Sequence, residues 1–393
     1  MGKYTNQVQD PRIRGDFRRI AWITTGFSKD DNDTGGAAAI HNLARELSLK
    51  DNIELTIFSL YYPLNQPEYK FYKAKVFSFA GKKAHKKIDK PGMWKECIKK
   101  FNDEHRTKPF DLIHSMWAGE SGNVAAKLAK KHKIPLIVNI CGGELAEIKE
   151  INYGSRLKYW QKKFVDTSLN SADKIVSGSD YITDKIEEYY GAKAKNKTVK
   201  IPFGADEKIF IPENRRGNKK YSIINIANAV PVKSHETLFR AMRIVNEKYP
   251  EAELNIFGHD DKGILRKLAS ETGIEGCIKI NNFTGHEQVA KMLNDSGIFV
   301  LSSLYESQNM SIIEAALCGL PVVSTDVGAA REVTEHIIKP GDYKELAIKI
   351  LNVIDNYETE KEKSVMKIKQ LINKYSLSVS VNAFAKLYSD LAH

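Results

Sequence analysis

Short apolar runs rich in β-branched residues alternate with helical patterns along the whole chain. In the first half they lie at residues 20–24, 54–60, 111–114, 136–140, 174–177 and 198–201. In the second half they lie at residues 222–227, 253–257, 277–280, 298–302 and 321–324. Strands that alternate with helices are typical of βαβ units, so each half predicts an open, largely parallel α/β sheet.

The segments between these runs carry apolar residues at helical spacing. Residues 236–248 and 312–318 show this pattern in the second half. Two further helices are predicted from faces formed by Ile40, Leu43, Ala44 and Leu47, and by Val381, Phe384, Leu387 and Leu391. The second of these faces belongs to an amphipathic segment at residues 378–393.

A chain of 393 residues suits two domains rather than one. Residues 202–220 contain two prolines, two glycines and a charged tail, which is typical of an interdomain linker. We therefore predict a first domain at 1–203 and a second at 204–375. Ligands of open α/β sheets bind beyond the carboxyl ends of the strands, so the chemistry is expected there.

Composition indicates a globular protein, with 42% hydrophobic and 28% charged residues. No stretch approaches the apolar length of a membrane span, and the polar start of the chain has no signal-peptide core. The four cysteines are scattered without metal-ligand spacing. These features lead us to expect a reduced, cytoplasmic protein without a structural disulfide.

The basic charge is concentrated in the first half. Residues 1–200 have a net charge of +12 and residues 201–393 a net charge of −1, and eleven lysines fall within residues 70–100. Lysines interleaved with aromatic residues favour contact with an anionic membrane surface, although Pro91 and Gly92 interrupt any helix there. A solvated lysine-rich surface is the alternative, and no nucleic-acid recognition module is present. The aromatic residues in question are Phe77, Phe79, Trp94 and Phe101.

The segment 302–333 carries the most informative candidate chemistry. A strand is expected to end near Ser302, and a helix to begin at Asn309 or Met310 after a polar loop. Unpaired backbone N–H groups at such a helix start suit a diphosphate. Glu306 in the loop and Glu314 inside the helix repel phosphate, but they suit the hydroxyls of a sugar and a ribose. The alternative is that Glu306 caps the helix and Glu314 lies on the surface.

This segment resembles the signature of the retaining, nucleotide-sugar-dependent glycosyltransferases called group 1 or family 4. Glu306 and Glu314 are separated by seven residues, and Gly319-Leu320-Pro321-Val322-Val323, Gly328 and Glu332 follow at matching offsets. The resemblance implies the GT-B fold, in which two Rossmann-like domains face each other across a cleft. It also implies that the C-terminal helix, residues 376–393, crosses back to the first domain.

The resemblance assigns roles to the residues of this motif. Glu306 would approach the hydroxyls of the donor sugar, and Glu314 would hold the ribose. The backbone of Ser307, Gln308, Asn309 and Met310 would bind the sugar and the diphosphate. The family usually has Glu-Gly-Phe-Gly here, so both glycines are missing from this chain, and Ala329 replaces a later glycine.

A second matching element covers residues 225–242. Lys233 matches a family lysine that neutralises the leaving diphosphate, and Asn228 stands where the family has an arginine. Ser234 is predicted to cap the following helix. The alternative for Lys233 is an ordinary surface lysine.

The first half contributes weaker candidates. Gly35 and Gly36 match a family loop that borders the diphosphate and the acceptor. The resemblance places His114, Cys141 and Gly142 near the transferred sugar, although a structural role is the alternative for His114 and for Cys141. Metal binding by the acidic run 30–33 is disfavoured, because the family is generally metal-independent; no cofactor is therefore expected.

The expected function is retaining transfer of a hexose from a UDP- or GDP-sugar to a hydroxyl acceptor. A glycan or a lipid-linked cell-envelope precursor, as in polysaccharide biosynthesis, fits a cytoplasmic protein bound peripherally at the inner face of the membrane. Two alternatives stay open: a degenerate, non-catalytic nucleotide-sugar-binding or partner protein of the same fold, and a sugar-nucleotide epimerase. The spacing of Glu306 and Glu314 argues against the epimerase.

Overall fold

The computed structural model describes residues 17–33, 38–81, 89–213, 219–282 and 285–392. Its contacts divide the chain into two compact units. Unit 1 comprises Met1–Ile140, Tyr159–Val176 and Val381–His393, and unit 2 comprises Cys141–Lys158 and Ser177–Ser380. The division places residues 177–203 with unit 2, whereas the sequence assigned them to the first domain.

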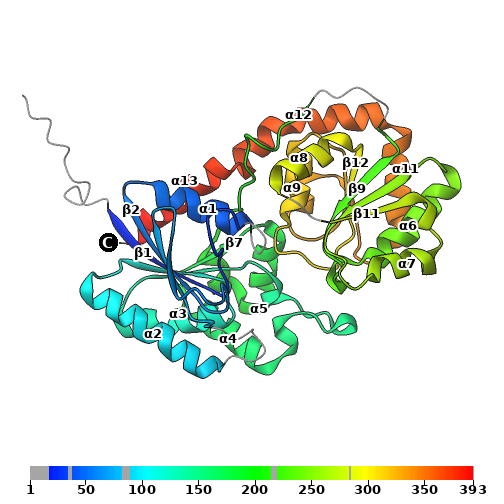
Figure 1. Ribbon diagram of the computed structural model, residues 1–393. Helices are drawn as coiled ribbons and strands as arrows, with labels where there is room; N and C mark the ends of the chain where they lie inside the picture. The colour runs from blue at the N-terminus through cyan, green and yellow to red at the C-terminus, as the bar shows by residue number, and fades with distance from the viewer. Residues whose placement is uncertain (1–16, 34–37, 82–88, 214–218, 283–284, 393) are drawn as a thin grey trace, which may run out of the picture. The chain divides into compact units, whose positions relative to one another are not determined.

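The first sheet, of which Figure 1 labels β1, β2 and β7, has the strand order β3-β4-β2-β1-β5-β6-β7-β8. The pairs β1–β2, β1–β5, β2–β4, β5–β6 and β6–β7 are parallel, whereas β3 pairs with β4 in antiparallel orientation. The hairpin of β3 and β4 was not predicted from the sequence, because its strands are only four and five residues long. The strands are β1 (Arg18–Thr24), β2 (Ile53–Ser59), β3 (Glu68–Phe71), β4 (Ala74–Ser78), β5 (Leu112–Met116), β6 (Leu136–Asn139), β7 (Lys174–Ser177) and β8 (Thr198–Lys200).

Helices of unit 1 cover this sheet through apolar faces. Of the predicted face at the end of the chain, Val381, Phe384 and Leu387 are buried. At the same end, the Tyr388 hydroxyl accepts a hydrogen bond from Trp22 Nε1 at 2.9 Å and lies 2.7 Å from His114 Nδ1. This helix is therefore joined to β1 and β5 by polar as well as apolar contacts. The helices are α1 (Ala38–Leu49), α2 (Lys90–Thr107), α3 (Glu120–His132), α4 (Tyr159–Ser171) and α13 (Leu377–Leu391), which belongs to unit 1 from Val381 onward.

The sheet of unit 2 has the order β11-β10-β9-β12-β13-β14, and every pairing is parallel. This order is the doubly wound arrangement, with a switch point between its first strand, β9, and its fourth, β12. The sequence predicted all of these strands except β14, whose three residues leave almost no pattern. The strands are β9 (Ser222–Ile226), β10 (Glu253–Phe257), β11 (Ile278–Asn281), β12 (Ile298–Leu301), β13 (Val322–Thr325) and β14 (His336–Ile338).

Both faces of this sheet are buried by helices (Figure 1). Ile224 and Phe299 point into a cluster with α9, whereas their neighbours Ile223 and Ile298 point into a cluster with α6. Burial on both faces explains the continuous apolar strands of this half. The helices of unit 2 are α5 (Asp180–Asn196), α6 (His235–Lys248), α7 (Ile264–Thr272), α8 (His286–Asp295), α9 (Met310–Leu317), α10 (Ala330–Val333), α11 (Tyr343–Asp355) and α12 (Tyr357–Tyr375).

The segment predicted as a linker, 202–220, is tightly integrated where the structure describes it. Phe210 lies in the core of unit 2. Ala205 N donates to Tyr375 O at 2.9 Å, and Leu377 N donates to Ala205 O at 2.8 Å. Its prolines and glycines therefore shape a packed segment rather than a solvated connection. No described helix is both long enough and apolar enough to cross a membrane.

The Tyr388 hydroxyl gives a test of this packing. Tyr388→Phe leaves the buried groups of Trp22 and His114 without their partner, so we expect the free energy of unfolding to fall by about 1–3 kcal/mol. Urea denaturation measures the change. The control Tyr159→Phe removes the hydroxyl of a side chain that is 72% exposed and should stay within about 0.5 kcal/mol of the parent. Equal effects of the two variants would contradict this account.

Candidate active site

Two loops meet at the switch point of the second sheet. Because β9 and β12 are neighbouring parallel strands, the loops that follow them, 227–234 and 302–309, leave the same edge. Leu304 N donates to Val232 O at 2.8 Å, and Ser302 Oγ donates to Lys233 O at 2.9 Å. These bonds fix the two loops against each other.

An ion pair joins the two candidate catalytic side chains. Lys233 Nζ lies 2.6 Å from Glu306 Oε1, and the side chains are only 22% and 12% exposed. Ser303 Oγ donates to the same carboxylate oxygen at 2.6 Å. Lys233 is therefore not the freely solvated surface lysine of the alternative interpretation.

Helix α9 begins at Met310, as the sequence predicted, with Asn309 as its N-cap. Asn309 Oδ1 accepts a hydrogen bond from Ile312 N at 3.0 Å, so Asn309 rather than Glu306 caps the helix. Among the described residues, the backbone N–H groups of Ser307, Gln308, Asn309 and Met310 have no hydrogen-bond acceptor. Such a row of unpaired donors at a helix start suits an anion.

Glu314 lies one turn inside α9 and is only 8% exposed, which excludes the surface position of the alternative interpretation. Burial raises the pKa of this carboxyl group to about 7, because the charged form is poorly solvated there. Glu306 and Glu314 therefore differ in environment: the first is paired with an ammonium group, and the second is desolvated.

The turn after β13 packs against the 302–309 loop. Gly328 has a φ of +57°, and a Cβ atom there would lie 2.5 Å from Gln308 O. Glu332 is a buried anchor that accepts hydrogen bonds from Asp180 N at 3.0 Å and Tyr375 Oη at 2.9 Å, and it also pairs with Lys374. These contacts lower the pKa of Glu332 against the opposing effect of burial. The family glycine and glutamate of this turn thus have structural roles here.

Residues 141–158 form a further part of unit 2. Glu144 accepts hydrogen bonds from the backbone N–H groups of Cys141, at 3.1 Å, and Gly142, at 2.6 Å. Burial, with smaller contributions from Glu306 and Glu144, raises the pKa of Tyr153 to about 12. The sequence singled out Cys141 and Gly142, and the structure adds the carboxylate that holds their loop.

The remaining predicted residues of the 225–242 element take structural positions. Asn228 Oδ1 accepts a hydrogen bond from His259 N at 3.0 Å, which ties the loops after β9 and β10 together. Ser234 is the N-cap residue of α6 by position, but the prediction that its side chain caps the helix was wrong. Its hydroxyl lies 2.8 Å from Thr237 Oγ1 and makes no capping bond to the backbone.

His114 is fully buried in unit 1, and burial lowers its pKa to about 3. A neutral ring bonded to Tyr388 supports the structural interpretation of this histidine. The acidic run likewise serves its own loop, since Asp33 accepts hydrogen bonds from Lys29 N at 2.9 Å and Tyr62 Oη at 3.0 Å. Gly35 and Gly36 lie outside the described residues.

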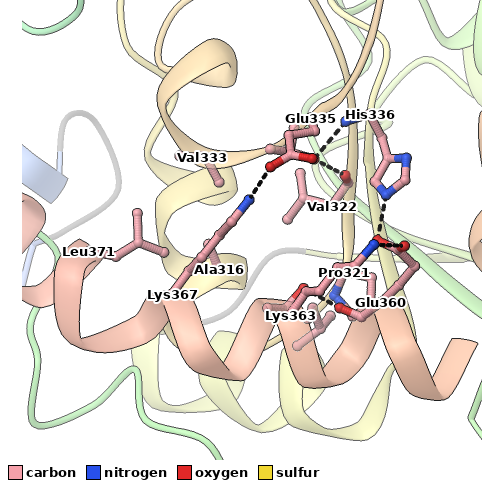
Figure 2. A pocket seen from close by; sticks show the side chains of 13 residues that line it. Ala316, Pro321, Val322, Val333, Glu335, His336, Glu360, Lys363, Lys367 and Leu371 are labelled. Carbon is pink, nitrogen blue, oxygen red and sulfur yellow. Dashed lines mark hydrogen bonds and ion pairs between the residues drawn. The ribbon is translucent and has the colours of Figure 1, made fainter.

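A hollow at the other end of the strands of the second sheet is lined by charged side chains that pair with one another. Figure 2 shows Lys367 directed toward Glu335, at 3.2 Å, and His336 toward Glu360, at 2.7 Å. His336 begins β14, so this hollow lies at the amino ends of the strands. Lys233 and Glu306 lie at the carboxyl ends, and the hollow is thus separate from the candidate active site.

The second sheet and its switch-point loops define an α/β protein of the doubly wound class, in which ligands bind beyond the carboxyl ends of the strands. Residues 206–388 match the family model described as "Glycosyl transferases group 1", and residues 34–208 match "Glycosyltransferase Family 4". The chain belongs to this glycosyltransferase family, whose members transfer a sugar from a nucleotide sugar, and it has two largely parallel α/β sheets as in GT-B proteins.

Curated relatives and solved structures agree with this assignment. An uncharacterized glycosyltransferase of Methanocaldococcus jannaschii is 26% identical over 72% of this chain and 76% of its own length. The next two curated relatives are matched over 44% and 55% of their lengths, about half of each.

Among solved structures, sucrose-phosphate synthase from Thermosynechococcus elongatus is 17% identical, with a TM-score of 0.78 over 95% of this chain and 99% of that one. A structure described as trehalose-6-phosphate from E. coli bound with UDP-2-fluoro glucose is 13% identical, with a TM-score of 0.70 over 94% and 99%. At these identities the likeness to solved structures concerns the fold alone.

Several residues around the 302–309 loop were not predicted from the sequence. Ser303 directly follows a predicted strand, so its position was a usable signal. Tyr153 and Glu144 lie more than 150 residues before Glu306 and carry no local motif. Only in the folded chain is the charge of Glu306 close enough to Tyr153 to raise its pKa.

The buried carboxyl group of Glu314 predicts a pH dependence of stability. Its folded pKa of about 7 exceeds its ordinary value of 4.5, so the folded protein holds the extra proton. This contribution is fully present below pH 4.5 and is lost as pH rises through 7. Relative to Glu314→Gln, the parent should lose roughly 2–3 kcal/mol of unfolding free energy between pH 4.5 and pH 8. Urea denaturation across this range tests it; a constant difference would contradict it.

Proposed function

We propose that this chain is a retaining glycosyltransferase that moves a hexose from a nucleoside diphosphate sugar to a hydroxyl acceptor. The observation that carries the proposal is the row of unpaired N–H groups from Ser307 to Met310, next to the ammonium group of Lys233. Together these groups supply the donors and the positive charge that a pyrophosphate requires. Glu306 and Glu314 flank this seat and would accept hydrogen bonds from hydroxyls.

In this proposal Lys233 exchanges partners during the reaction. Glu306 neutralises Lys233 in the structure, so the ammonium group has no unbalanced charge before the donor binds. When the donor binds, Lys233 turns to the pyrophosphate, and Glu306 is released to a hydroxyl of the sugar. Charge that develops on the leaving diphosphate is then stabilised by groups already in place, which is worth roughly 3–4 kcal/mol for one strong donor.

The proposed reaction needs no protein nucleophile. The acceptor hydroxyl attacks on the face from which the diphosphate departs, and a diphosphate oxygen takes the acceptor proton. The protein positions the reactants and stabilises charge, as transfer with retention requires. Lys233 and the helix start provide the positive charge, so we propose that no metal ion or other cofactor takes part.

Glu314 is proposed to hold the ribose of the nucleotide. A buried carboxyl group can accept hydrogen bonds from two neighbouring hydroxyls, which replace the water that burial removed. The nucleotide is proposed to carry uracil or guanine. The fold neighbour described as bound with UDP-2-fluoro glucose supports uracil of these two bases.

We further propose that the acceptor is a glycan or a lipid-linked cell-envelope precursor and that the protein works in the cytoplasm at the inner face of the membrane. The lysines of residues 70–100 support contact with an anionic membrane, although residues 82–88 lie outside the part of the chain that the structure describes. The expectation that Phe77 and Phe101 contribute to contact with the membrane was wrong. Both side chains are buried in the core of unit 1, where they pack on Phe58.

A different aromatic pair is exposed in unit 1. Tyr159 and Trp160 at the start of α4 are 72% and 63% exposed, and Lys163 lies over the Trp160 ring at 5.3 Å. Phe164 of the same helix packs against Trp94 of the lysine-rich α2. Exposed aromatic rings beside lysines suit the interface of an anionic membrane, so this pair replaces Phe77 and Phe101 in the proposal.

Donor hydrolysis tests the proposed chemistry. Purified protein with UDP- or GDP-sugars should release nucleoside diphosphate slowly, and Lys233→Ala should lower this rate by about 10²–10³. Glu306→Ala should abolish the release, because both the sugar contact and the partner of Lys233 are lost. Arg331→Ala is the matched surface control and should retain the parent rate.

A thermal-shift screen with UDP-, GDP- and ADP-sugars identifies the donor, since ligand binding raises the melting temperature. Stabilisation by a nucleotide sugar without any turnover across acceptors would overturn the enzymatic proposal. That result would favour the non-catalytic nucleotide-sugar-binding alternative instead.

Vesicle binding tests the membrane surface. The protein should co-sediment with vesicles that contain an anionic lipid and not with neutral ones, and Trp160→Ala should weaken binding about tenfold. Met366→Ala, at a side chain that is 80% exposed on α12, should leave binding unchanged. Equal losses in both variants, or binding that ignores lipid charge, would contradict this assignment.

A further inference from the structure

Gln308 uses its side chain in a way that the sequence motif does not indicate. Its amide oxygen accepts a hydrogen bond from Phe203 N at 2.8 Å, and its amide nitrogen donates to Phe203 O at 2.7 Å. The side chain is buried, at 4% exposure, so water does not compete for these bonds. A primary amide is the side chain that pairs with both polar groups of one backbone residue at once.

The backbone around Gln308 is held from two other directions. Ser307 O accepts a hydrogen bond from Ser179 Oγ at 2.7 Å, and Gln308 O accepts one from Ala329 N at 2.9 Å. All of these bonds engage the carbonyl groups or the side chain of the loop. The N–H groups of residues 307–310 are therefore the ones left without acceptors in the described structure.

The loop needs this support because it contains a strained residue. Asn309 has a φ of +67°, in the region that non-glycine residues rarely adopt. Such a conformation costs roughly 1–3 kcal/mol and persists only where the surroundings enforce it. Glycine would adopt it at little cost, but this chain has Asn at the position.

We propose that Gln308 is a positioning residue, whose amide grips the Phe203 backbone and thereby holds the 306–310 loop with its N–H groups presented to the diphosphate of the donor. This inference rests on the proposed function, which it deepens by assigning a role to a side chain that does not itself contact the donor. The grip substitutes for the glycines that the family has at neighbouring positions.

Gln308→Met tests the grip, since it keeps an unbranched side chain of similar length and removes both hydrogen bonds. We expect the Kd for UDP or GDP, whichever stabilises the parent protein, to rise about tenfold, as loss of a buried hydrogen bond implies. In donor hydrolysis the KM of the nucleotide sugar should rise more than kcat falls, because Lys233 and Glu306 remain.

Asn294 provides a matched structural control. Its amide grips a backbone segment of the same unit in the same way: Oδ1 accepts from Glu213 N at 2.8 Å, and Nδ2 donates to Ile211 O at 3.0 Å. Asn294→Leu should lower the melting temperature about as much as Gln308→Met. It should leave the Kd for the nucleotide within about twofold of the parent, because Asn294 does not contact the loop.

Gly178→Ala gives a second route if Gln308→Met does not fold. A Cβ atom at Gly178 would lie 2.4 Å from Gln308 Oε1, so the alanine displaces the amide without removing a polar group. The Kd should again rise about tenfold. Calorimetric titration of all four proteins with UDP and GDP provides the measurement.

The outcomes separate the inference from the proposed function. If the parent protein binds no nucleotide or nucleotide sugar at millimolar concentration, the proposed function fails. If the parent binds but Gln308→Met and Gly178→Ala bind equally well, only the positioning role fails. An equal loss of affinity in Asn294→Leu also overturns it, because general destabilisation would then explain the effect.

Discussion

The parallel pairing of β9 with β12 is the constraint on which the candidate active site depends. Strand order reverses between these two strands, and the loops that follow them leave the same end of the sheet, where hydrogen bonds join them. Lys233 comes from one loop and Glu306 from the other, about 70 residues apart in sequence. Any change that shifts the register of β9 against β12 would separate the ammonium group from the carboxylate.

The ionisable side chains at this end of the sheet are each stabilised before a ligand binds. Lys233 and Glu306 neutralise each other, and Ser303 adds a hydrogen bond to the carboxylate. Glu314 has no cationic partner among the residues that the structure describes, and burial raises its pKa instead. Two glutamates with seven residues between them are thus stabilised in different ways, Glu306 by pairing with an ammonium group and Glu314 by a raised pKa that favours its protonated form.

The loop between the two glutamates shows how a fold can keep a backbone shape after losing the glycines that usually form it. Asn309 tolerates a positive φ better than most residues and also caps α9 with its side chain. Gln308 and Ser307 fasten the loop to Phe203 and Ser179, and Gly328 leaves room beneath it. Strain at one residue is balanced by contacts that come from three separate parts of unit 2.

The sequence by itself determined the two α/β sheets, most of their strands, the start of α9 and the Glu306–Glu314 spacing, because these follow from local periodicity and a local motif. It missed β3, β4 and β14, whose short strands have too few residues for a period to emerge. It also mistook the packed segment around Phe210 for a linker and the buried rings of Phe77 and Phe101 for membrane anchors. Only the tertiary structure decided that Lys233 pairs with Glu306, that Glu314 is desolvated and that Gln308 grips Phe203. Those outcomes depend on which distant side chains share a space from which water is excluded, and no local pattern records that.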